Sequence, residues 1–195
     1  MVEDEKIVFI NGYPIYKKPV LQEKSKKVFM PIGKVASVSI RKSLTEPLVF
    51  ATKDEVKRLY SSWGIVAVIR NPYDRLVSTY SYFKETPGKT GLKFRTFEEF
   101  IAAAYDSPDD ATNCHVRSQL GLLSYDNKLL PNILISYENI NSVKDHLPIS
   151  KLIWEDFTRS KHQPWEEYYT DKLAQMVEER FAGDFELYNM LNEEN

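Results

Sequence analysis

The sequence predicts an α/β fold in which a central parallel sheet is flanked by helices and preceded by an N-terminal β-hairpin. One observation is that short apolar runs, typical of buried strands, alternate with amphipathic stretches, typical of helices. Another is that 195 residues, 43% of them apolar, suffice for one well-buried domain and are too few for two comfortable ones. We therefore expect residues 1–195 to form a single domain.

The first 27 residues are expected to form the hairpin and a basic segment. Residues 6–10 and 13–17 flank Asn11-Gly12, a strong short-range hairpin signal. Two core strands and two helices are expected next along the chain. They are a strand at 28–32, a turn at 33–36 with a helix start at 37–44, a short strand at 48–51, and an amphipathic helix at 53–61 with Val56, Leu59 and Tyr60 inward.

The run Ile65–Ile69 is the clearest strand, because five apolar residues without a charge are typical of a strand buried on both faces. Arg70 ends it. Asn71 can cap a helix and Pro72 suits the first helical turn. The strand thus delivers an arginine to a helix start, at the kind of sheet edge where α/β proteins bind ligands. Arg70 either binds a phosphate or sulfate there or forms a structural ion pair.

The second half of the chain continues the alternation. Residues 86–91 form a polar loop, and residues 97–105 a helix capped by Thr96, with Glu99 completing a capping box. The later elements are a moderately helical stretch at 112–123, a buried strand at 133–136, and a helix that opens at 170–172 and buries Leu173, Met176, Val177 and Phe181.

Charge and cysteine usage limit the function classes. The net charge of −2 gives no global attraction to nucleic acid or to an anionic membrane. Residues 15–42 hold eight basic residues and one acid, either as a solvated face or as an entrance for anions. The single Cys114 fits a reducing compartment. The N-terminus lacks the features of a signal peptide and no apolar run reaches membrane-spanning length, so we expect a soluble, cytoplasmic protein.

The turn after the first core strand is a second candidate for anion binding. It carries Lys34, and a helix start with Ser37 and Ser39 follows it. The turn does not match a Walker A loop, because Val28 stands where that motif needs glycine and Val35 where it needs Ser or Thr. No metal site is expected either. The three histidines are scattered without ligand spacing: His115, His146 and His162.

The two stretches together resemble the sulfotransferases. Residues 34–39 (KVASVS) look like their 5′-phosphosulfate loop, and residues 70–78 (RNPYDRLVS) look like their 3′-phosphate motif, close to the carbohydrate-type and bacterial "family 2" enzymes. The similarity continues weakly to residue 190, through 115–119, 135–139, 168–170 and 184–185. The resemblance implies a P-loop-like fold. It also implies in-line transfer of a sulfuryl group from 3′-phosphoadenosine 5′-phosphosulfate (PAPS) to a hydroxyl or amine of a carbohydrate or small molecule, leaving PAP.

The resemblance also implies roles for residues of this chain. Lys34 would offset charge on the bridging oxygen of the donor. Arg70 and Ser78 would bind the 3′-phosphate, and Asp74 and Arg75 would form structural pairs. The 5′-phosphate would be held by the amides of Ala36, Ser37, Val38 and Ser39 and by the two serine hydroxyls. The stretch Ser160-Lys161-His162 would line the nucleotide, and no metal is implied.

The chain departs from the family pattern at Gly33, Ala36 and Val38, and it has Phe50 and Ala51 where a catalytic His or Glu is common. Transfer to a hydroxyl calls for a general base. The candidates are His115, Asp54 and Glu55, against the alternatives of a hydrogen-bonded histidine and of helix-capping acids.

Acceptor contacts are expected from the loop 86–91 and from the lysines between residues 17 and 27. Two other functions remain open: a nucleotide-binding protein that has lost turnover, and a Mg²⁺-dependent phosphotransferase. The sequence leaves the acceptor and the oligomeric state undetermined, and neither nucleic acid nor a membrane is expected as a partner.

Overall fold

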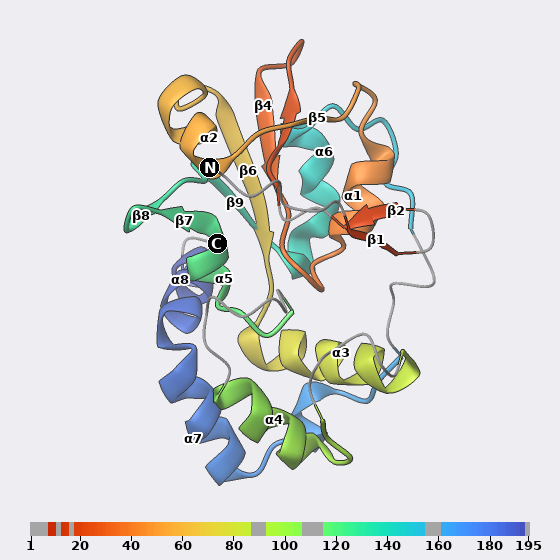
Figure 1. The fold of residues 1–195 in the computed structure, drawn as a ribbon, viewed down its shortest axis with the longest axis vertical. Coiled ribbons are helices and arrows are strands. Elements are labelled where there is room, and N and C mark those ends of the chain that lie inside the picture. Colours follow the sequence, from red (N-terminus) through yellow and green to blue (C-terminus); the bar gives the residue numbers. More distant parts are fainter. Residues whose placement is uncertain are drawn as a thin grey trace.

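A computed structural model describes residues 8–10, 13–15, 18–86, 93–106, 115–154 and 161–193 (Figure 1). Its elements in chain order are β1 (Val8–Ile10), β2 (Tyr13–Ile15), β3 (Val20–Gln22), β4 (Lys27–Met30), α1 (Ser37–Ser43), β5 (Val49–Phe50), α2 (Lys53–Leu59), β6 (Gly64–Ile69), α3 (Pro72–Glu85), α4 (Phe97–Tyr105), α5 (Gln119–Leu123), β7 (Ser124–Tyr125), β8 (Lys128–Leu129), β9 (Ile133–Ser136), the 3-10 helix η1 (Tyr137–Ser142), α6 (Val143–His146), the 3-10 helix η3 (Trp165–Glu167), α7 (Asp171–Arg180) and α8 (Ala182–Glu193).

The main sheet has five strands in the order β5-β3-β4-β6-β9. β4, β6 and β9 are parallel, as the alternation of strands and helices predicts. β3 runs antiparallel to both β4 and β5, however, so the sheet is mixed and the expectation of a wholly parallel sheet is wrong. The fold is α/β, with helices flanking this mixed sheet.

The expected N-terminal hairpin is confirmed where the structure describes it. β1 pairs antiparallel with β2, and Ile10 stands opposite Tyr13. The turn residues Asn11 and Gly12 lie outside the described residues.

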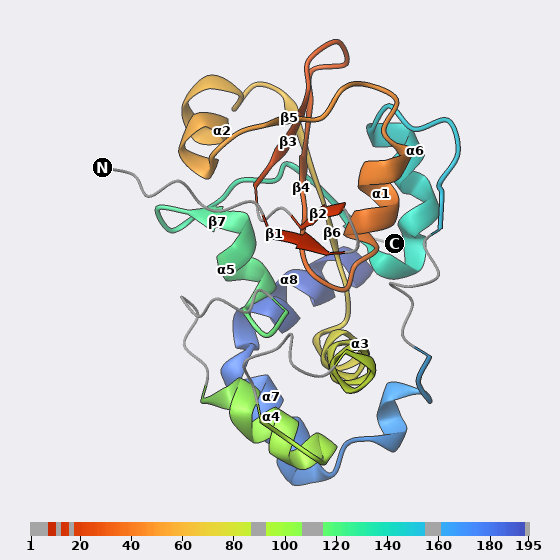
Figure 2. The ribbon, with the colours of Figure 1, turned by 45° about the vertical axis from the view of Figure 1, so that its right-hand side comes forward.

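β6 lies between two parallel neighbours and is buried along its length from Ile65 to Ile69. Both of its faces are covered, which explains why every residue of this run is apolar. Figures 1 and 2 show α1 and α6 on one face of the sheet, and α2, α5 and α8 on the other. The carboxyl end of β6 leads directly into α3, which crosses beneath the sheet.

The apolar side chains form two clusters, one around the sheet and one between α3, α4 and α7. The second cluster is largely aromatic. Tyr80 of α3 packs edge-to-face against Phe97 of α4, with ring centroids 5.3 Å apart. Tyr168 and Tyr169 contact the same phenylalanine, so they pack as expected. α3 therefore connects the sheet, through β6, to the helices α4 and α7.

The predicted start of α3 is confirmed. Asn71 is the N-cap, its side chain accepts a hydrogen bond from the amide of Tyr73, and Pro72 occupies the first helical position. Leu76, Tyr80 and Phe83 are all buried, as their helical spacing predicts.

The caps of α2 and α4 differ from the prediction. Thr96 caps α4 as expected, but the Glu99 carboxylate accepts from the amide of Arg95 instead of completing a capping box. The capping box is found at α2, between Thr52 and Glu55. Leu59 was expected to face inward, yet 60% of it is exposed, because α2 ends at this residue and only Val56 is fully buried.

The predicted helix at 112–123 is much shorter in the structure. α5 begins only at Gln119, and residues 115–117 form a turn and bends. Residues 112–114 and most of the expected loop at 86–91 lie outside the described residues. Among the described residues, none of the helices is long and apolar enough to span a membrane.

Candidate functional site

The turns that follow β4 and β6 meet at one hydrogen bond. The Nη1 of Arg70 donates to the backbone carbonyl of Lys34 at 3.1 Å. The Nε of the same guanidinium donates to the Asp74 carboxylate at 2.6 Å, and the guanidinium lies 4.4 Å from the ring centroid of Tyr137. These contacts hold Arg70 between the first turn of α3, the turn after β4 and the residue that follows β9.

The backbone of Arg70 is clamped by Gln119, a fully buried residue at the start of α5. The side-chain oxygen of Gln119 accepts from the Arg70 amide at 3.1 Å, and its side-chain nitrogen donates to the Arg70 carbonyl at 2.9 Å. The buried carboxylate of Asp184 accepts in turn from the amides of Gln119 and Leu120 and from the hydroxyl of Ser118. A chain of buried hydrogen bonds thus runs from α8 to the carboxyl end of β6.

The turn after β4 has an unusual backbone. Lys34 and Ala36 both have positive φ angles, 68° and 59°, and neither is glycine. Ser37 closes the turn, because its hydroxyl donates to the carbonyl of Ile32 at 2.6 Å and accepts from the amide of Ile32 at 3.1 Å. The expected phosphate-binding hydroxyl of Ser37 is therefore already engaged within the turn.

Lys34 is partly buried. Its Nζ is 4.4 Å from the ring centroid of Tyr82, near the carboxyl end of α3. Burial, and to a lesser degree the positive charge of Arg70, lower the pKa of Lys34 to about 7, while the carboxylate of Glu85 acts in the opposite direction. Lys34 can therefore gain or lose a proton near neutral pH.

His115, one of the candidate bases, lies beside the same turn. Its ring stacks on Tyr82 with centroids 5.6 Å apart and packs edge-to-face on Phe83 at 5.5 Å. A Cβ atom added to Gly33 would lie only 3.1 Å from the His115 ring, so only glycine fits here without displacing that ring. The structure thus brings Lys34 and His115 together at Tyr82.

Arg75 of α3 links the turn after β4 to the turn before α5. Its side chain is 1% exposed, and it donates to the carbonyl of Gly33 at 3.3 Å and to the carbonyl of Arg117 at 2.8 Å. Its role is structural, as expected, and these two partners are backbone carbonyl groups. Asp74 forms the expected structural pair at the helix start, with Arg70 as its partner, so the structural ion pair considered for Arg70 is present.

The other predicted nucleotide-binding residues lie in different settings. Ser39 and Ser78 are almost fully buried, with exposed fractions of 1% and 2%. Lys161 is exposed, and Ser160 lies outside the described residues. The Nε2 of His162 lies 3.9 Å from the Asp74 carboxylate, so the chain after residue 160 returns to the Arg70 side of the site.

Asp54 and Glu55, the two acidic candidates for the general base, form hydrogen bonds and an ion pair within α2 and at its N-cap. The Glu55 carboxylate accepts from both the amide and the hydroxyl of Thr52, and these hydrogen bonds lower its pKa. Asp54 pairs with Arg58 one turn along the helix at 2.8 Å. Of the three candidates, His115 is the one that stacks on Tyr82, the ring that Lys34 also contacts.

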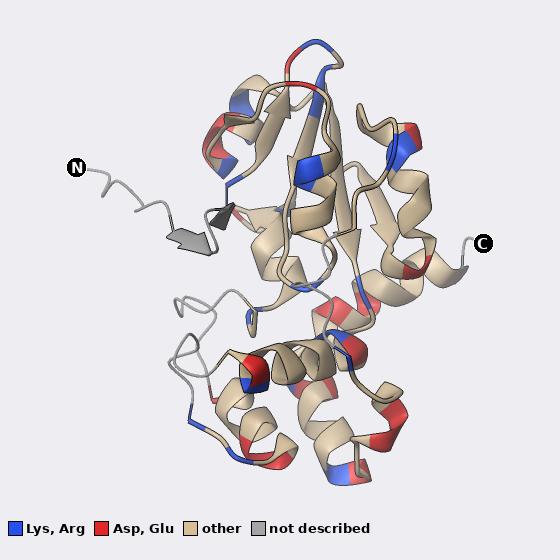
Figure 3. Ribbon diagram, turned by 90° about the vertical axis from the view of Figure 1, so that its right-hand side faces the viewer, with Lys and Arg blue, Asp and Glu red and all other residues tan. Residues whose placement is uncertain are grey.

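The lysines expected to contact an acceptor are divided between the two edges of the sheet. Lys24 and Lys26 are in the β3–β4 turn, before β4 begins, whereas Lys34 follows its end. Figure 3 shows this turn at the end of the sheet opposite α3. Lys24 and Lys26 therefore do not share an edge of the sheet with Lys34 and Arg70. Lys18 does, because it precedes β3, whose first residue Val20 pairs with Phe29 near the end of β4. Of the loop expected to share this role, residues 87–91 lie outside the described residues.

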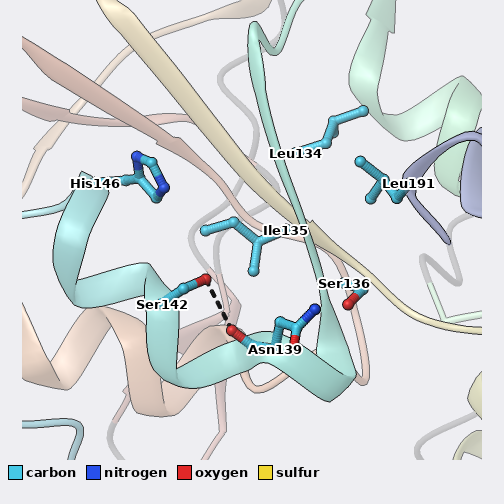
Figure 4. A pocket seen from close by; sticks show the side chains of 7 residues that line it. All are labelled: Leu134, Ile135, Ser136, Asn139, Ser142, His146 and Leu191. Atoms are coloured by element: carbon cyan, nitrogen blue, oxygen red, sulfur yellow. Dashed lines mark hydrogen bonds between the residues drawn. The ribbon is translucent and has the colours of Figure 1, made fainter. Parts of the chain in front are cut away.

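A separate hollow lies at the edge of β9 (Figure 4), with a volume of about 140 Å³. Its lining is Leu134, Ile135, Ser136, Asn139, Ser142, His146 and Leu191. Lys34, Arg70 and His115 do not line it. The buried hydroxyl of Ser136 has no hydrogen-bond partner, and a small polar hollow of this size suits ordered water.

Sequence reasoning missed the roles of Gln119, Asp184 and Tyr82. Gln119 and Asp184 lie in stretches that resemble the sulfotransferases, but nothing in the sequence links either of them to Arg70. Within the part of the chain that the structure describes, no group of three or more His, Cys, Asp or Glu residues is placed to hold a metal ion. Comparisons with protein-family models, with curated proteins and with solved structures find no match to this chain.

Proposed function

We propose that this protein is a PAPS-dependent sulfotransferase that transfers a sulfuryl group to a hydroxyl or amine. The observation that carries the proposal is the hydrogen bond from Arg70 to the Lys34 carbonyl. It joins the two segments that resemble the donor-binding motifs of that family. A nucleotide with phosphates at its 3′ and 5′ positions needs two anion-binding segments that lie close enough together to contact both phosphates at once.

The charges near this hydrogen bond suit such a donor. Of the five N–H groups of the Arg70 guanidinium, Asp74 engages the Nε–H and the Lys34 carbonyl engages one on Nη1, so the others can donate to a 3′-phosphate. Lys34 is partly buried, so its positive charge is less screened by water and can act on a developing negative charge. The P-loop-like reading of the strand, turn and helix at residues 27–43 is part of this proposal.

In the proposed reaction, the acceptor oxygen attacks sulfur while the bond from sulfur to the bridging phosphate oxygen breaks. Protonated Lys34 offsets the charge that accumulates on that oxygen, which leaves on PAP. His115 takes the proton of the acceptor hydroxyl, because its ring lies beside Gly33 and on the same tyrosine as Lys34. No metal ion is needed to balance these charges.

Calorimetric titration with PAP tests the binding half of the proposal. We expect PAP to bind the wild-type protein and Arg70→Ala to weaken binding about a hundredfold or more, because a charge-assisted contact to phosphate is lost. Arg58→Ala is the matched control, since Arg58 is an exposed arginine that pairs with Asp54 on α2. Unchanged PAP affinity in Arg70→Ala, with the fold intact by circular dichroism, contradicts the proposed site.

Turnover separates the remaining functions. With PAPS and a broad panel of acceptors, Lys34→Ala should lose far more turnover than donor affinity. PAP binding without any sulfated product would favour a nucleotide-binding protein that has lost turnover. An activity that disappears on chelation of Mg²⁺ would favour a phosphotransferase.

A further inference from the structure

Tyr82 is the side chain that both candidate catalytic groups share. The Nζ of Lys34 lies 4.4 Å from its ring centroid, and the His115 ring stacks on it at an interplanar angle of 23°. Lys34 comes from the turn after β4 and His115 from the turn before α5, whereas Tyr82 belongs to α3. Three separate parts of the chain therefore converge on this one aromatic ring.

The ring acts on Lys34 electrostatically. The face of an aromatic ring is negative, so a cation within about 6 Å of its centroid is attracted to it. Other groups around the amine act in both directions: Arg70, at the end of β6, disfavours its charge and Glu85, on α3, favours it. The ring thus adds to Glu85 in keeping the buried amine protonated.

We propose that Tyr82 is a positioning residue of this site, whose ring keeps the Lys34 amine charged and holds it on the same side of α3 as the His115 imidazole. The proposal deepens the proposed sulfotransferase function and rests on it for the catalytic meaning of the two groups. The contact itself does not depend on that function. The phenol hydroxyl has no part in this role, so the aromatic ring alone should suffice.

The direct test is a pH titration of Lys34. It is monitored by NMR in protein labelled with ¹³C at the lysine ε-carbons. Lys34→Arg assigns the signal. We expect the Lys34 midpoint to be unchanged in Tyr82→Phe and to fall by about half a pH unit in Tyr82→Leu. Tyr105→Leu, which removes a half-exposed ring on α4, is the control and should leave the midpoint in place.

A second variant separates the electrostatic role from packing. Tyr82→pentafluorophenylalanine keeps a ring of nearly the same shape but reverses the charge of its face, so its Lys34 midpoint should also fall. This variant keeps the proposal testable if Tyr82→Leu does not fold. An equal Lys34 midpoint in the phenylalanine and pentafluorophenylalanine variants overturns the proposal, whatever their stability.

The activity experiment distinguishes this inference from the proposed function. In an active enzyme, the alkaline limb of the turnover profile should move to lower pH in Tyr82→pentafluorophenylalanine and stay in place in Tyr82→Phe. A wild-type protein that neither binds PAP nor turns over, but whose Lys34 midpoint depends on the ring, refutes the sulfotransferase proposal and leaves the Lys34–Tyr82 coupling intact. PAP binding with a ring-independent midpoint refutes only the role of Tyr82.

Discussion

Replacing Gln119 with leucine tests whether the clamp on Arg70 supports both the fold and the site. Leucine has nearly the same size, but it removes the acceptor at 3.1 Å and the donor at 2.9 Å from the backbone of Arg70. Both backbone groups then lack a partner at a position that water does not reach, because Gln119 is fully buried. Each buried polar group without its partner costs about 1–3 kcal/mol, so the two groups together should cost about 2–6 kcal/mol in the free energy of unfolding.

That loss is a large part of the typical 5–15 kcal/mol stability of a domain, so urea denaturation will detect it readily. Gln175→Leu is the matched control. Gln175 is an exposed glutamine on α7 that bonds to Glu179, and its replacement should change stability by less than about 0.5 kcal/mol. Equal stability of the two variants would refute the reasoning. A Gln119→Leu protein that still folds should also bind PAP more weakly, because the Arg70 backbone is no longer fixed.

Two further predictions concern the pH dependence of stability and the start of α2. Folding lowers the pKa of Lys34 from 10.5 to about 7, so between these values the unfolded chain binds a proton that the folded protein has released. The free energy of unfolding should therefore rise with pH across this window, and Lys34→Met should flatten the rise in urea titrations at stepped pH. Lys53, with a pKa lowered to about 8, leaves a smaller slope of the same sign in the variant, and an unchanged slope would contradict the assignment. Thr52→Ala should lower the free energy of unfolding by about 1 kcal/mol, because the capping box is lost. Thr52→Ser should keep the capping box and the wild-type stability.

Local signals in the sequence predicted local structure well. The start of α3 follows from Asn71 and Pro72 alone, because a cap and a proline act within one turn. β6 follows from its apolar run, since burial on both faces leaves no polar position. β3 was missed, because Val20–Gln22 is only three residues long and lies among lysines. It becomes a strand only through pairing with β4 and β5.

The proximity of Lys34 and Arg70 was predictable from the sequence, but the contacts that hold them in place were not. Lys34 and Arg70 were singled out because each follows a strand at the edge where parallel strands end. Their direct contact agrees with that reasoning. The Gln119 clamp and the Tyr82 platform depend on residues far apart in the chain, and no spacing rule connects them. Glu55 was named as a base candidate although its spacing from Thr52 is that of a capping box, which the structure contains.

The place of β4 inside the sheet has a practical consequence for shortened forms of the chain. β4 pairs with β3 on one side and with β6 on the other, so the turn that carries Lys34 extends from an interior strand. A truncation that starts at Glu23 would strip β3 away and leave β4 with bare amide and carbonyl groups. An unpaired strand edge can form hydrogen bonds with a strand of another molecule, so the truncated protein should self-associate. The turn that carries Lys34 would then no longer keep its present geometry.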